Sequence, residues 1–257
     1  MDCRRLHPIL ALLALTLMVV ALACPPDSAA AAQPGMAMAT PIEPPPARSL
    51  PLPISAGLLE RRLASWPAWS LPAPLPRPDR DDLIWPAWFR GEWEVSSTSA
   101  DGAEPPLRWR ARFVPNGNGG AVADRAFNAS QIGKALLGDE LISVRNDPAN
   151  PNRQVSLLRG DRQLESTVVG RRSARPDGAT FLADELTLQL FHGPGAPRIS
   201  RVEVLGLWQR HEDGSISGEQ WQASYGSPAA GLAAQADHPQ RFSLRLVPLP
   251  PGSDRAS

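Results

Sequence analysis

The sequence predicts an all-β domain, an antiparallel up-and-down barrel of about eight to ten strands with one short helix, over residues 83–249. Two observations carry this prediction. Apolar and polar residues alternate in segment after segment, as in Leu107–Phe113, where Leu, Trp, Ala and Phe alternate with three arginines. Turn sequences such as Asn116-Gly-Asn-Gly-Gly120 separate these segments at regular spacing. Alternation with period two is typical of half-buried strands, and regular turn spacing favours a barrel or sandwich.

The expected strands follow one another with turn residues between them. The first begins at Gly91, the second is Leu107–Phe113, and the third is Ala121–Phe127, which pairs back across the Asn-Gly turn. The remaining segments that alternate or are rich in β-branched residues are Leu141–Arg145, Gln154–Arg159, Leu164–Arg171, Ala179–Phe191, Ile199–Arg210, Ser215–Tyr225 and Arg241–Val247. Sequential hairpins of this kind favour an up-and-down order around the barrel.

One helix is expected inside the domain, over Asn128–Leu137. Asn128 or Ser130 provides a cap residue at its start, and Gly138 ends it.

The N-terminal residues 1–32 read as an export signal. Arg4 and Arg5 precede the apolar run Ile9–Cys24, and Ala29–Ala32 supplies the small residues that a signal peptidase requires. Two alternatives remain: an uncleaved membrane anchor, and a lipoprotein modified at Cys24. Cys3 and Cys24 are the only cysteines, so cleavage near Ala32 would leave a mature chain without thiols or disulfides.

Residues 33–82 are expected to form a linker between the membrane and the domain. Prolines are dense here, and each one removes a backbone donor. A short amphipathic helix is predicted near residues 56–65. Trp66-Pro-Ala-Trp69 recurs as Trp85-Pro-Ala-Trp88. The repeat is either a coincidence or an aromatic patch on the domain surface, or a sign that the first copy imitates the second and docks near the same edge. Residues 250–257 are expected to be a disordered tail.

Charge and histidine content exclude several functions. Lys+Arg and Asp+Glu both number 26, so no basic surface field attracts nucleic acid. Beyond the leader, the histidines are His192, His211 and His238, which lie on separate turns without metal-ligand spacing. We therefore expect no catalytic residue, no metal and no cofactor.

The start of the domain resembles that of lipocalins and their calycin relatives. The carrying residues are Gly91-Glu92-Trp93, a Gly-x-Trp element at the first strand. The resemblance implies that Trp93 plugs the closed end of a barrel and that Gly91 lets the chain fold over its floor. Lipocalins also place an arginine of the last strand across this tryptophan. Here the alternation of Phe242, Leu244 and Leu246 directs Arg241 and Arg245 outward. Either the last strand runs on the opposite parity, with Val247 inward, or the arginine is missing, as in a calycin-like barrel that is not a true lipocalin.

A second resemblance covers nearly the whole domain. Trp88-Phe-Arg-Gly-Glu-Trp-Glu-Val-Ser-Ser97, Arg112-Phe-Val-Pro115 and Val122-Ala-Asp-Arg-Ala-Phe-Asn128 are similar to a family of exported cyanobacterial and plastid proteins of unknown function. Its most specific element is Asp-Arg-x-Phe-Asn. The resemblance implies a thylakoid-lumen or periplasmic location and supplies no activity.

Two sets of residues stand out for the site. Candidate ligand-binding residues are Arg125, Phe127, Trp109, Trp208 and Trp221, and motif residues with a structural role are Gly91, Trp93, Trp88, Asp124 and Asn128. Arg125 either pairs with Asp124, Glu92 or Glu94 on the outer wall, or faces inward and binds the head group of a lipid or pigment. The tryptophans either fill the barrel or line a pocket.

The expected function is non-catalytic binding of a small apolar molecule, such as a lipid, quinone or pigment, close to a membrane. The rival is a structural or assembly factor that binds a photosynthetic membrane complex. A calycin-type enzyme ranks third, because no paired catalytic groups stand out.

Overall fold

The computed structural model describes residues 54–72, 75–102 and 105–250. The expected signal peptide or anchor, the first part of the expected linker and the tail beyond residue 250 lie outside these ranges. Among the helices of the described part, none has both the length and the apolar character needed to cross a membrane.

The domain is built on a single antiparallel sheet of ten strands. In chain order these are β1 (Gly91–Ser99), β2 (Leu107–Pro115), β3 (Ala121–Ala123), β4 (Leu141–Asp147), β5 (Asn150–Leu158), β6 (Arg162–Ala174), β7 (Thr180–His192), β8 (Arg198–Arg210), β9 (Ile216–Ser224) and β10 (Asp237–Pro248). Their order in the sheet is β3-β2-β1-β10-β9-β8-β7-β6-β5-β4. The predicted fold class, a lipocalin-like up-and-down sheet with one short helix, is thereby confirmed.

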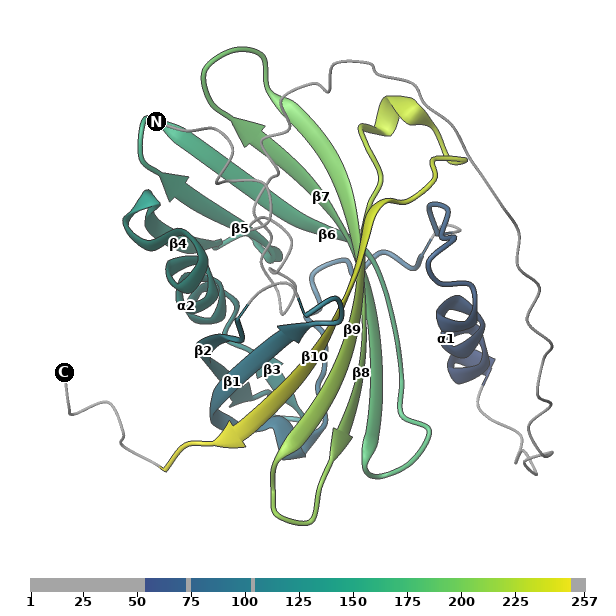
Figure 1. The fold of residues 1–257 in the computed structure, drawn as a ribbon. Coiled ribbons are helices and arrows are strands. Elements are labelled where there is room, and N and C mark those ends of the chain that lie inside the picture. Colours follow the sequence, from purple (N-terminus) through teal and green to yellow (C-terminus); the bar gives the residue numbers. More distant parts are fainter. Residues whose placement is uncertain (1–53, 73–74, 103–104, 251–257) are drawn as a thin grey trace.

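The sheet curls into a half-barrel that is interrupted at one place. The first strand pairs with the last, since Val95 lies opposite Leu246. The break falls instead between β3 and β4, which are not neighbours in the sheet. Helix α2 (Arg125–Leu137) joins these two edge strands and lies beside the break (Figure 1). The edge strands are thus covered in part by helix, which limits pairing with other chains.

Alternation assigns one face of every strand to the inside of the curl. On β1, Trp93, Val95 and Ser97 are buried while Glu94 is exposed. The partners of these buried positions are inward-facing residues of β2 and β10, and the register carries the same face on to β7 and β8. We call this the concave face and the other the convex face.

One end of the concave face is filled by aromatic rings, and we call it the closed end. Rings of Trp85, Phe89, Phe113, Phe181 and Trp208 pack with centroids 4.6–6.3 Å apart. The short 3-10 helix η3 (Ala87–Phe89) brings Phe89 into this cluster. Trp93 joins the same core, and its Nε1 donates to the Phe89 carbonyl at 2.7 Å. The aromatic stretch before the first strand therefore belongs to the core.

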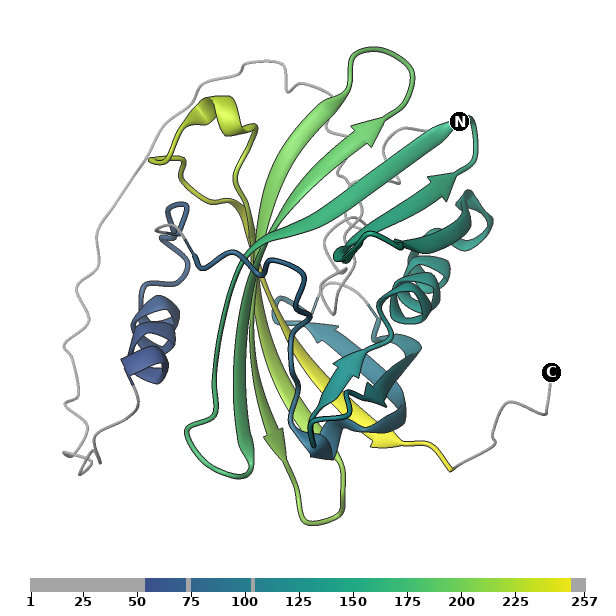
Figure 2. The ribbon, with the colours of Figure 1, turned by 180° about the vertical axis from the view of Figure 1, so that it is seen from behind.

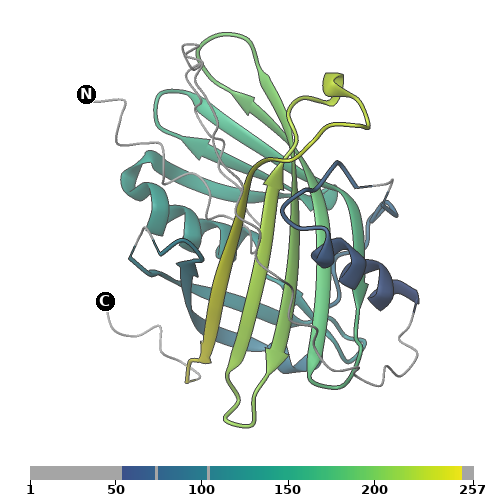
Figure 3. The same cartoon turned by 45° about the vertical axis from the view of Figure 1, so that its right-hand side comes forward.

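A second core lies on the convex face, beneath helix α1 (Ile54–Ala64). Leu59 and Trp69 pack there against Leu205 and Tyr225. Figure 3 shows α1 lying against the outside of the sheet. The predicted helix near residues 56–65 is present, but residues 54–72 do not extend away as a linker. The first Trp-Pro-Ala-Trp copy packs on the convex face, whereas the second packs at the closed end, so the prediction that both dock near the same edge was wrong.

Arg62 of α1 anchors this helix. Its Nε donates to Glu203 Oε1 at 2.8 Å, and its Nη2 donates to the Ser70 carbonyl at 2.7 Å and the Tyr225 hydroxyl at 2.8 Å. The Tyr225 hydroxyl in turn donates to Glu203. Burial of Glu203 is tolerated because it is paired and hydrogen-bonded.

The last strand follows the predicted parity. Arg241 and Arg245 are exposed on the convex face, where they pair with Glu219 and Asp213. Neither lies across Trp93, so the arginine expected of a lipocalin is absent from β10. Gly91 has φ of +115°, a conformation that side chains rarely adopt, at the point where the chain enters β1.

Candidate functional site

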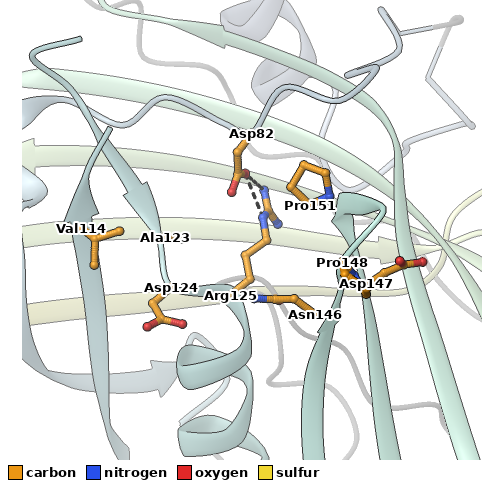
Figure 4. Close-up of a pocket in the computed structure, with 9 residues that line it drawn as sticks. All are labelled: Asp82, Val114, Ala123, Asp124, Arg125, Asn146, Asp147, Pro148 and Pro151. Carbon is orange, nitrogen blue, oxygen red and sulfur yellow. Dashed lines mark hydrogen bonds and ion pairs between the residues drawn. The ribbon is translucent and has the colours of Figure 1, made fainter. Parts of the chain in front are cut away.

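The Asp124-Arg-Ala-Phe-Asn128 element forms the junction between β3 and α2 (Figure 4). The predicted third strand, Ala121–Phe127, was too long, because β3 ends at Ala123 and the helix begins at Arg125. The predicted caps, Asn128 and Ser130, were also wrong. Asp124 is the cap, and its Oδ1 accepts from the Phe127 amide at 3.2 Å. The strand stops early because the Asp124 carboxylate accepts a hydrogen bond from an amide of the first helical turn, which favours the start of a helix over continued strand pairing.

Asn128 fastens α2 to strand β2. It is buried, its Oδ1 accepts from the Arg112 amide at 2.7 Å, and its Nδ2 donates to the Arg112 carbonyl at 3.1 Å. An amide side chain thus binds the backbone just beyond the pairing of β2 with β3, which starts at Phe113. Phe127 lies half-buried, with the Arg112 guanidinium carbon 4.1 Å from its ring centroid. It therefore does not line the inside of the barrel.

Arg125 points into the break of the sheet and is 2% exposed. Its Nε and Nη2 donate to Asp82 Oδ1 at 2.9 and 2.6 Å, and Nη2 also contacts Glu185 Oε1 at 3.1 Å. The expectation that it pairs with Asp124, Glu92 or Glu94 on the outer wall was wrong. The first helical turn, rather than a strand, sets the direction of this side chain.

Those three carboxylates are taken by other arginines. Asp124 pairs with Arg112 at 2.7 Å, Glu92 pairs with Arg110 and Arg112, and Glu94 pairs with Arg108 at 2.9 Å.

The ion pair of Arg125 extends into a buried cluster. Arg171 Nε donates to Glu185 Oε1 at 2.7 Å, and its Nη2 donates to Asn152 Oδ1 at 2.6 Å. We call Asp82, Arg125, Asn152, Arg171 and Glu185 the latch. Burial acts to raise the pKa of Glu185, but Arg125 and Arg171 hold it below its ordinary value. Two arginines and two carboxylates leave the latch without net charge.

The latch holds a chain segment, residues 75–85, which we call the strap. The Arg171 amide donates to the Pro76 carbonyl at 2.9 Å, and Trp85 exchanges two backbone hydrogen bonds with Ala121 at the edge of β3. The strap therefore connects β3 with the part of β6 that lies beyond its pairing with β5, and it does so across the break (Figure 2). Side chains also donate to strap carbonyls, since the Asp81 carbonyl accepts from Asn152 Nδ2 and Arg171 Nη1, each at 3.0 Å.

Pockets lie along the strap. One of about 330 Å³ is lined by Asp82, Arg125 and residues of the β4–β5 turn, with Val114, Ala123 and Asp124 opposite. Figure 4 shows Arg125 directed across it toward Asp82. Another, of about 580 Å³, is lined by residues 76–79, 81–84 and 171, 173–175. Arg125 reaches the first pocket with its charge already balanced by two carboxylates, so an anionic head group would have to displace them.

The three candidate tryptophans occupy two faces. Trp109 and Trp208 belong to the closed end, whereas Trp221 lies on the convex face, where the Arg241 guanidinium carbon is 5.2 Å from its ring centroid. Trp208 packs over Gly218 of the neighbouring strand, where a Cβ atom would clash with the ring. The tryptophans therefore do not form a single ligand site. Trp88 stacks on Phe89 at 4.4 Å, at the edge of the same core.

The opposite end of the concave face, around Ser166 of β6 and Gln189 of β7, has a different lining, and we call it the far end. Polar side chains are buried there among apolar ones. Ser166 Oγ and Gln189 Nε2 are buried and have no hydrogen-bond partner in the described part of the chain. The sequence carries a signal for this lining, because Leu164 and Val168 face inward and alternation places Ser166 inward between them. A polar residue at an inward position indicates either a hydrogen-bond network or a binding site.

Within the described ranges, no group of three or more His, Cys, Asp or Glu side chains is placed to hold a metal ion. Comparison with protein families matches residues 99–238, more than half of the chain, to a domain of unknown function (DUF6816). Comparison with curated proteins finds no match, and comparison with solved structures finds none either.

Proposed function

The chain belongs to the family of the domain of unknown function DUF6816, whose description assigns no activity, and we propose that it binds a small, mainly apolar molecule without catalysis. The ligand lies against the far end of the concave face. One observation carries the proposal: this wall combines buried apolar side chains, Leu164, Val168, Phe191 and Val202, with buried polar atoms that have no partner among the described residues. Small-molecule sites commonly combine these two features.

The closed end is filled by protein side chains, so we place the ligand at the far end. The rings of Phe89, Phe113, Phe181 and Trp208 fill the closed end by packing against one another. Side chains of the protein thus occupy the volume that a ligand would need there. The tryptophans of the closed end support the binding wall through packing, and they do not themselves hold the ligand.

The arrangement of titratable groups favours binding over catalysis. Within the described residues, the three histidines lie apart, and His211 Nε2 contacts the Ser217 hydroxyl at 2.8 Å on the surface. The latch carboxylates are engaged by two arginines, so neither is free to act as a general base. A nucleophile beside a base, the usual sign of covalent catalysis, is not part of the far end.

The leader supports a proposed location. The positively charged N-terminus, the apolar run Ile9–Cys24 and the small residues at Ala29–Ala32 support export, and the resemblance to exported cyanobacterial and plastid proteins implies a thylakoid lumen or periplasm. An uncleaved leader would keep the domain near the membrane, where apolar ligands partition. A carrier for a lipid, quinone or pigment fits that setting.

The rival is a structural or assembly factor for a photosynthetic membrane complex. It is favoured by the edge strand β4, which exposes 59% of Ile142. An apolar side chain on an edge strand is a common means of binding another protein.

Native mass spectrometry of the protein purified from its own membranes, followed by organic extraction, separates the two functions. We expect a mass increment that extraction removes, together with an apolar compound in the extract. An empty protein that co-purifies with a large membrane complex would overturn the carrier function and support the rival.

A further inference from the structure

We propose that Ser166 and Gln189 bind an uncharged hydrogen-bond acceptor of the ligand, such as a quinone or ester carbonyl oxygen. This inference rests on the proposed function, because it specifies the chemistry of the same binding wall. The two residues belong to a row of polar side chains that crosses four strands of the concave face. The row consists of Gln154, Ser166, Gln189 and Ser200, each paired with the next in the register.

Gln154 and Ser200 of this row each have a hydrogen-bond partner within the protein, and the bond made by Ser200 orients Gln189. Gln154 Nε2 donates to the Pro151 carbonyl at 3.1 Å. Ser200 Oγ contacts Gln189 Oε1 at 3.3 Å, which turns the amide so that its Nε2 faces away without a partner.

Ser166 Oγ, on the opposite side of Gln189, is likewise buried without a partner. Directly paired positions of an antiparallel sheet have Cβ atoms about 5 Å apart, so both groups can donate to one acceptor.

Apolar residues flank this pair on both sides. The neighbouring row toward the end of the sheet contains Leu164 and Phe191, and the row toward the middle contains Val168 and Val202 with the half-buried Thr187 between them. The four apolar side chains are buried. The pattern fits a ligand with an apolar body and one polar group at its centre of contact. A water molecule that bridges the two polar groups would still leave the apolar flanks without contacts.

The acceptor has to be uncharged. In these three rows the one charged side chain is Arg198, which is exposed and whose guanidinium carbon lies 4.6 Å from the Phe191 ring centroid. No cation therefore reaches the Ser166–Gln189 pair within the wall. A carboxylate or phosphate placed there would lose its hydration without gaining a counter-charge, which strongly disfavours binding.

Calorimetric titration of the purified full chain with three probes tests this chemistry. The probes are a decyl-substituted benzoquinone, decylbenzene, which has the same chain but no carbonyl, and decanoate, which carries a charge. We expect the quinone to bind at least tenfold more tightly than either of the others. Ser166→Ala and Gln189→Met should each weaken quinone binding about fivefold to tenfold, because each removes one hydrogen bond. Decylbenzene affinity should stay unchanged.

Thermal unfolding without ligand separates a binding role from a structural one. Ser166 Oγ makes no hydrogen bond within the protein, so Ser166→Ala should leave the melting temperature unchanged or raise it. Ser96→Ala on the convex side of β1 and Gln209→Met at an exposed position of β8 serve as matched controls for both measurements.

Equal affinity of the wild type for the quinone and decylbenzene would overturn this inference and leave apolar binding intact. A Ser166→Ala variant that melts several degrees lower while keeping its quinone affinity would also overturn it, because the pair would then be structural. Failure of all three probes to bind would overturn the proposed function, and this inference with it.

Discussion

Asp184 and Glu185 are adjacent in β7 and have pKa values shifted in opposite directions, because they lie on opposite faces of the sheet. Asp184 is buried on the convex face, where burial and the nearby Glu203 raise its pKa to about 8 in spite of Arg172 at 2.8 Å. Glu185 faces the strap, where two arginines hold its pKa below the ordinary value. The sheet thus separates Asp184, whose protonated form is stabilised, from Glu185, whose ionised form is stabilised.

The raised pKa of Asp184 predicts a pH dependence of stability. Its folded pKa of about 8 lies above the unfolded value of about 3.9, so its contribution is fully present below pH 4 and is lost as pH rises toward 8. Asp184→Asn should therefore stabilise the protein at pH 9 by about 1–3 kcal/mol and have little effect at pH 4. Urea unfolding at both pH values measures this difference.

Asp139→Asn, at an exposed position, is the control for Asp184→Asn and should change stability by less than about 0.5 kcal/mol at either pH. A constant effect of Asp184→Asn across this range would contradict the prediction.

The latch predicts a large stability loss on removal of Arg125. Arg125→Leu leaves Asp82 and Glu185 mostly buried with only Arg171 nearby, which should lower the free energy of unfolding by about 3 kcal/mol. Adding Asp82→Asn removes one of the uncompensated charges and should recover part of the loss. Chemical denaturation of both variants tests this.

Arg108→Leu is the matched control, since it breaks an exposed pair with Glu94 and should cost less than about 1 kcal/mol. If Arg125→Leu unfolds at the wild-type denaturant concentration, the latch does not stabilise the strap.

The strands could be predicted from the sequence because one face of each is buried, which imposes period two. Ile199–Arg210, for example, was expected, and β8 is Arg198–Arg210. The third strand was extended wrongly to Phe127, because the Asn-Gly turn before Ala121 predicted a strand that pairs back across it. The cap at Asp124 decided the outcome, and its preference for a helix start competes locally with the sheet.

Long-range partners could not be predicted in the same way. Arg125 lies 43 residues from Asp82 and 60 from Glu185, and nothing in the local pattern connects them. The strap escaped prediction because its prolines exclude regular strand pairing, yet its carbonyls still accept hydrogen bonds. Likewise Ser166 and Gln189 become a pair only through the register of β6 with β7.

Trp69 predicts that residues 54–72 are part of the folded domain. It is buried on the convex face, and its Nε1 donates to the Arg62 carbonyl at 2.8 Å. Trp69→Ala should cost about 3–5 kcal/mol, because a large ring is removed from a packed core. Thermal denaturation followed by circular dichroism measures the loss. Leu232→Ala, at a position 76% exposed, should change stability by no more than about 0.5 kcal/mol. Equal effects of both substitutions would contradict the packing of this segment on the sheet.

Gly218 predicts a steric limit at the closed end. A Cβ at this position would meet Cζ3 and Cε3 of Trp208, whose ring is held between Trp85 and Phe89. Gly218→Ala should therefore destabilise the protein by about 1–3 kcal/mol, since the ring has no space to move. Gly226→Ala is the matched control, because nothing lies within 4 Å of its Cβ position and its φ is not positive.

The cause of the Gly218 effect can be isolated with a double variant. Trp208→Phe supplies a smaller ring, so combining it with Gly218→Ala should cost less than the two single losses added together. A coupling of about 1 kcal/mol between the two sites is expected for residues in direct contact. Urea denaturation of the two single variants and the double variant completes the cycle. Strict additivity would show that Gly218 is required for a reason other than contact with Trp208.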